Sequence, residues 1–263
     1  MDPLYQMRRE KSPTFRILYG SIVGLGMVVV GLSLYRIISD RAPAIWLALA
    51  LLAAVAGSFS LRIPGMHGRV SAGDTVTCLS ILLAGPYAGA LTAVADAVSG
   101  SLRCSRRRLQ YAFYNSANSA LSAFASGLMV SRLSGKPILY RGDAVTAASL
   151  LVPLCMMAGS YFLMNTGLVA AAVAAEKSLS FVDTWREGFM WTCVNYVAGA
   201  FVAGLLALTP DVLSPVKLAI VLLSCLAAYV SSRAHILLAA RVRQHRCKAQ
   251  ADDDDEVQAS TPL

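Results

Sequence analysis

Long apolar runs separated by short polar segments fill most of the chain, and each run has the length of a helix. A helix that crosses a bilayer needs about 20 mostly apolar residues. The pattern predicts an all-α protein, a polytopic transmembrane helix bundle with about eight spans. The expected helices cover residues 17–38, 44–61, 74–84, 86–102, 110–130, 144–175, 187–208 and 215–241.

The distribution of charge divides the chain into three predicted parts. Residues 1–16 form a basic cytoplasmic N-terminus, and residues 17–241 form a single transmembrane domain. Residues 242–263 are basic and then acidic, and this composition predicts a disordered cytoplasmic tail. The first apolar run is longer than the core of a signal peptide and no small-residue cleavage site follows it, so we expect a retained span.

The third and fourth expected helices form an unusual pair, because both are short and they meet at Gly85-Pro86. Proline suits the first turn of a new helix, where its missing N–H costs nothing. The pair is either two tilted spans or one re-entrant hairpin, and the charge pattern favours two spans. Asp74 and Asp96 lie in or near its apolar runs.

Composition and charge support a membrane protein with both termini in the cytoplasm. Hydrophobic residues make up 56% of the 263 residues and charged residues 14%, whereas soluble domains carry about 25% charged residues. The net charge of +8 therefore indicates helix flanks at anionic headgroups and not nucleic-acid binding. With eight spans and an inside N-terminus, 17 of the 23 Lys and Arg residues fall inside and 6 outside.

Carboxylates and amides within the apolar runs are the candidate binding groups. Such groups are costly in hydrocarbon and face a cavity or a polar partner. Asp74 has an alternative role as a helix N-cap, and each asparagine has one as a hydrogen-bonding link between helices. A shared polar cavity explains them together. The predicted ligand-binding residues are Asp74, Asp96, Asn115, Asn118, Asn165 and Asn195, with Arg62 and Arg103 flanking the hairpin; Tyr111, Tyr114, Tyr161 and Tyr196 are candidates to line the cavity.

The sequence contains no motif of a known catalytic or metal site. It lacks a nucleophile elbow, a P-loop, an HExxH pair and a dinucleotide fingerprint. Its six cysteines are widely spaced and its three histidines are scattered. We therefore expect no enzyme activity, no metal and no cofactor.

Two segments carry a resemblance to a known group of proteins: FSLRIPG at residues 59–65 and VSAGDTVTCLSILLAGPYAGALTAVADAVSGSLR at residues 70–103. They resemble the N-terminal membrane domain of bacterial signalling proteins such as diguanylate cyclases and HD-type phosphohydrolases, over about residues 44–208. The resemblance implies a sensory or input module of the bacterial inner membrane. No output domain follows within this sequence, so it does not extend to cyclic-dinucleotide chemistry.

The sequence leaves two functions open. The first is a membrane-embedded module that binds an unknown small molecule and acts through a cytoplasmic or membrane protein partner. The second is a small-solute transporter or the substrate-binding subunit of one. The short helices around Gly85-Pro86 are also similar in pattern to the membrane subunits of vitamin transporters.

Overall fold

The computed structural model describes residues 13–41, 44–58, 61–62, 69–70, 73–102, 109–135 and 146–208. This part is helical, apart from one short antiparallel strand pair in which Arg62 faces Arg69. The expected helix at 215–241, the tail at 242–263 and most of the N-terminal segment lie outside the described residues. The elements are α1 (Pro13–Ser39), α2 (Ile45–Ser58), β1 (Leu61–Arg62), β2 (Arg69–Val70), α3 (Gly73–Ala84), α4 (Pro86–Leu102), α5 (Leu109–Ser134), α6 (Ala147–Lys177), α7 (Phe181–Phe189), η4 (Met190–Thr192) and α8 (Cys193–Ala207).

The expected helix at 187–208 is the main difference from the predicted pattern. The structure divides this region into α7, η4 and α8, with a bend of 58° between the two α-helices. α7 begins earlier because Ser180 caps it, its side chain accepting a hydrogen bond from the backbone N–H of Asp183 at 3.4 Å. The charged residues of α7 are exposed, so this amphipathic helix does not extend the apolar run of α8.

Gly85 joins α3 to α4 in a tight reversal. Its φ of 92° lies in the left-handed region, which glycine adopts without steric cost. The two helices then fold back on each other, and Thr92 Oγ1 donates a hydrogen bond to Ser80 Oγ at 2.9 Å. A side chain at Gly127 of α5 would collide with Pro86, so α5 lies directly against this joint.

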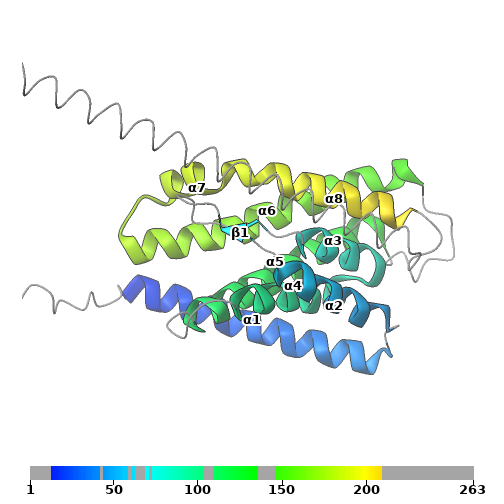
Figure 1. Ribbon diagram of the computed structural model, residues 1–263, viewed down its shortest axis with the longest axis horizontal. Coiled ribbons are helices and arrows are strands. Elements are labelled where there is room, and N and C mark those ends of the chain that lie inside the picture. The colour runs from blue at the N-terminus through cyan, green and yellow to red at the C-terminus, as the bar shows by residue number, and fades with distance from the viewer. Residues whose placement is uncertain are drawn as a thin grey trace, which may run out of the picture.

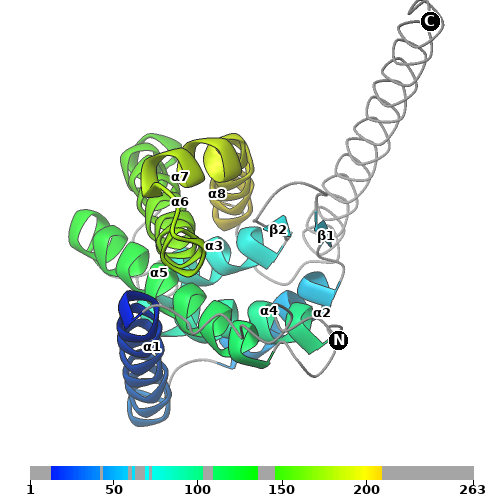
Figure 2. The same cartoon turned by 90° about the vertical axis from the view of Figure 1, so that its left-hand side faces the viewer.

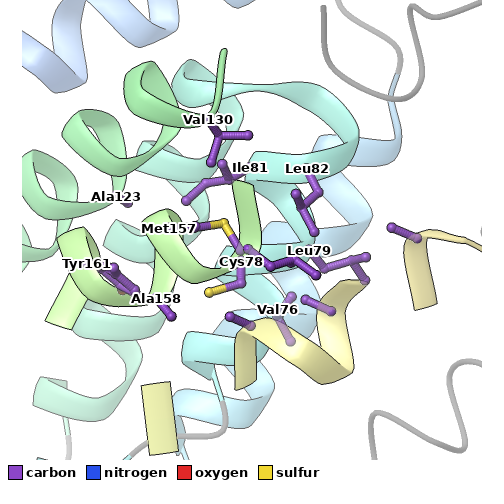
Figure 3. Packing of buried hydrophobic residues seen from close by; sticks show 14 of the residues in the cluster. Val76, Cys78, Leu79, Ile81, Leu82, Ala123, Val130, Met157, Ala158 and Tyr161 are labelled. Atoms are coloured by element: carbon purple, nitrogen blue, oxygen red, sulfur yellow. The ribbon is translucent and has the colours of Figure 1, made fainter. Parts of the chain in front are cut away.

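The α3–α4 hairpin occupies the interior of the bundle. α3 contacts α2, α4, α5 and α8, and in the end-on view it lies between α8 and the pair α2 and α4 (Figure 2). Nine of its twelve residues are buried. Side chains from α3, α5 and α6 pack together around Cys78 and Met157 (Figure 3). The backbone break at Gly85 is therefore covered by protein, as a break at membrane depth requires.

The outer helices carry the surface suited to lipid. α1 and α6 are each long and apolar enough to cross a membrane, and α7 with α8 adds a third candidate if the bent pair is one span. α1 lies along one edge of the bundle (Figure 1). Ile17, Val28 and Val194 are more than half exposed. Large exposed apolar side chains on several helices indicate association with a membrane.

Candidate functional site

Asp74 lies in the first turn of α3 and is linked to α6. The hydroxyl of Tyr161 donates a hydrogen bond to Asp74 Oδ1 at 3.1 Å. Tyr161 is fully buried among apolar side chains. A buried hydroxyl needs such a partner, and a carboxylate acceptor makes the bond charge-assisted. Asp74 is thus an acceptor for another helix as well as an acidic residue at a helix N-terminus.

Tyr196 of α8 connects this contact to the asparagines. Its ring meets the ring of Tyr161 edge to face, with centroids 5.3 Å apart. Its hydroxyl oxygen accepts a hydrogen bond from Asn165 Nδ2 at 2.6 Å. Tyr161 and Asn165 are both on α6, four residues apart, and therefore lie on the same face of that helix. The helices α3, α6 and α8 meet through these side chains.

Asn118 of α5 completes the series. Its Nδ2 donates to the backbone oxygen of Asn165 at 3.0 Å and also to Asn165 Oδ1. We call the five residues Asp74, Asn118, Tyr161, Asn165 and Tyr196 the polar network. The polar network joins four helices. Asn118, Tyr161 and Tyr196 are buried, and Asp74 and Asn165 are half-buried.

Asp96 occupies a separate junction between α2, α3 and α4. Its side chain is 8% exposed. A methyl group at Gly73 would overlap the Asp96 carboxylate, and one at Gly57 would lie 2.6 Å from Asp96 Oδ1. Two glycines therefore make room for this side chain. The carboxylate lies against the first residue of α3, where the helix dipole favours a negative charge.

The structure brings some of the predicted site residues together and leaves others apart. Asp74, Asn118 and Asn165 belong to the polar network, whereas Asn115 and Asn195 are half-buried outside it. Arg62 is placed as backbone in β1, and Arg103 lies outside the described residues. Of the four predicted tyrosines, Tyr161 and Tyr196 join the network. Tyr111 instead donates to half-buried Glu176, and Tyr114 donates to the Leu168 backbone oxygen.

Small hydroxyl residues between α3 and α4 also belong to the polar interior. Thr77, Ser80 and Thr92 are fully buried. They were not predicted from the sequence, because Ser and Thr can bond to their own helix backbone. Their spacing could have indicated them: Thr92 and Asp96 are four residues apart, as are Gly73 and Thr77, so each pair lies on one helix face.

The interior that the structure describes is acidic and aromatic. Every described Lys and Arg side chain is exposed. Asp74 accepts a hydrogen bond from the buried hydroxyl of Tyr161, and Asp96 is itself buried. The described residues contain no group of three metal-ligating side chains. This arrangement can accept hydrogen bonds and hold positive charge.

Comparisons with known proteins identify no relative. No protein-family model, no curated protein and no solved structure matches the chain.

Proposed function

We propose that this protein is a multi-pass membrane module that binds a small ligand at the polar network and passes its state to a protein partner on the cytoplasmic side. It spans the bacterial cytoplasmic membrane about eight times, with both termini inside. The apolar outer surfaces of α1 and α6 support the membrane location. The excess of Lys and Arg in alternate segments supports the orientation.

One observation carries this proposal: the polar network connects four helices through side chains inside an apolar bundle. Simple links between two helices would need one polar pair each. Here a single series of contacts couples α3, α5, α6 and α8. A ligand that changes any one contact alters how four helices pack, which is the response that a sensory module needs.

A ligand screen on the purified full chain tests the proposal. The midpoint of thermal unfolding is measured in detergent micelles against a chemically diverse library of small polar compounds. A compound bound to the native state raises the midpoint in proportion to its saturation. We expect at least one compound that stabilises the wild type and has no effect on Asn165→Ala. A library in which no compound stabilises either protein would contradict the binding proposal.

Transport is the second candidate function, and the buried carboxylate of Asp96, outside the polar network, favours it because such groups mark substrate and proton paths. The stabilising compound is offered to liposomes that contain the wild type or Asp96→Asn. Uptake by the wild type that Asp96→Asn abolishes would identify a transporter. Binding without uptake, together with a cytoplasmic protein that crosslinks in a ligand-dependent manner, would identify the sensor.

A further inference from the structure

The carbonyl oxygen of Asn118 is the starting point of a more specific inference. Asn118 is 1% exposed, and its Oδ1 has no hydrogen-bond partner among the described residues. A buried acceptor left in this state loses the hydrogen bonds that water gives it in the unfolded chain, which is unfavourable. The oxygen therefore calls for a donor that the neighbouring side chains do not supply.

The amide of Asn118 cannot be reversed to remove this demand. Its nitrogen faces both the backbone oxygen and the Oδ1 of Asn165. A reversed amide would place its carbonyl oxygen against two acceptors, which is repulsive. If Asn165 were reversed as well, its carbonyl oxygen would face the Tyr196 oxygen, and the tyrosine would have to become the donor of that bond. The Asn165 backbone oxygen would still face the carbonyl oxygen of Asn118, which is a second acceptor.

Two further buried hydroxyl groups also have no hydrogen-bond partner among the described residues. Ser122 lies one turn beyond Asn118 on α5, and Thr77 lies on α3, which contacts α5. Both residues are completely buried, and neither Oγ of Ser122 nor Oγ1 of Thr77 has a partner among the described residues. A hydroxyl can accept a hydrogen bond as well as donate one, so the described interior contains, with Asn118 Oδ1, three buried oxygens that could accept from a ligand.

The surrounding charge selects the kind of donor. Asp74 is a carboxylic acid of the network and accepts a hydrogen bond from Tyr161, and the described interior contains no Lys or Arg side chain. Tyr161, Tyr196 and Phe162 form an aromatic group with centroid separations of 5.3 and 5.7 Å. Aromatic faces and carboxylates attract cations strongly where water is excluded.

We propose, as a refinement that rests on the proposed function, that the polar network binds a small ammonium-type cation whose N–H groups donate to Asn118 Oδ1. The carboxylate of Asp74 and the faces of Tyr161 and Tyr196 offset its charge. Because Asn118 is buried, the proposed ligand is small, ammonium or a short primary amine. Ammonium matches the site because it has four donors and no acceptor.

Thermal unfolding of the full chain in nanodiscs tests this assignment with three chlorides. Ammonium is the ligand, potassium is a cation of similar size without N–H groups, and tetramethylammonium has the charge but no donor. We expect a saturable rise in the midpoint with ammonium alone. Asn118→Ala should abolish the rise, whereas Ser126→Ala should keep it, because Ser126 is buried on the same helix and bonds to the Ser122 backbone oxygen.

Calorimetric titration of the native protein with ammonium and methylammonium gives a second readout that does not depend on a variant folding. Saturable heat with ammonium that potassium does not produce supports the assignment. An equal response to potassium, an unchanged response in Asn118→Ala, or no saturable heat overturns it. The proposed function can then still hold, because a library compound of another class that needs Asn165 would show binding at the network.

Discussion

The Tyr161 hydroxyl donates a hydrogen bond to Asp74 Oδ1 at 3.1 Å, across 87 positions of sequence. This bond ties the middle of α6 to the first turn of α3. Asp74 and Asp96 were both predicted to bind a ligand, with an N-cap of α3 as the alternative for Asp74. In the structure Asp74 reaches a second helix, while the Asp96 carboxylate lies against Gly73 at the start of α3. The ligand-binding role of both acids stays a prediction.

Removing the Tyr161 hydroxyl is expected to destabilise the bundle. Tyr161→Phe keeps the ring against Tyr196 but deletes the donor to Asp74. A hydrogen bond to a charged group contributes about 1.5–3 kcal/mol, so the midpoint of thermal unfolding in detergent should fall by several degrees.

Tyr111→Phe is the matched control for that substitution. It makes the same chemical change at a tyrosine that is 43% exposed and bonds Glu176 at 2.7 Å. Water replaces an exposed bond at little cost, so the midpoint should stay near that of the wild type. Equal losses in the two variants would contradict a special role for the bond to Asp74.

Substitution at Asn165 should cost more than the same substitution at Asn195. Asn165→Ala removes a partner from both Asn118 and Tyr196, which are buried. Each polar group left unsatisfied costs about 1–3 kcal/mol. Asn195 is half-buried on α8, outside the network, so Asn195→Ala should change the unfolding midpoint much less. Equal midpoints for the two variants would show that the network does not stabilise the helices.

The helical pattern was largely readable from the sequence. The bounds of α3 and α4 agree with the predicted helices to within one residue, because Gly85-Pro86 marks both a turn and a helix start. The division of 187–208 was not predicted. The helix that begins after the N-cap at Ser180 has a charged face, and its composition therefore resembles that of a loop. The number of spans stays a prediction, because two helices, or three with the bent pair, meet the length and apolarity of a span in the part described.

The site was predictable in residue type but not in pairing. Buried Asn and Asp in apolar runs signalled a polar interior, and three of them meet in the network. Their partners depend on how helices rotate about their axes. Asn115 and Asn118 are three residues apart and were expected on one face, yet a separation of about 60° around the helix leaves Asn118 buried and Asn115 half-buried. Sequence spacing does not determine which of the two turns toward α6.

Reporter fusions will check the predicted orientation. A fluorescent protein fused to the N-terminus should fluoresce, and alkaline phosphatase at the same place should be inactive, because the basic N-terminal segment is predicted inside. A fusion after Gly135, at the end of α5, should give the opposite result. Matching signals at both positions would contradict an odd number of spans between them.

The close approach of Gly73 to Asp96 predicts that adding one methyl group destabilises the bundle. A methyl group from Gly73→Ala would overlap the Asp96 carboxylate, so α3 or α4 must shift. Overpacking of this kind typically costs about 1–3 kcal/mol. Gly24→Ala adds the same methyl on α1, where no atom outside the helix's own backbone lies within 4 Å, and should leave the midpoint within about a degree of the wild type.

The double variant Gly73→Ala with Asp96→Ala should be more stable than the sum of the single losses, since shortening the acid removes most of the overlap. A double-mutant cycle on unfolding free energies measures this coupling, expected at about 0.5–3 kcal/mol, and strictly additive losses would show that the two residues do not meet.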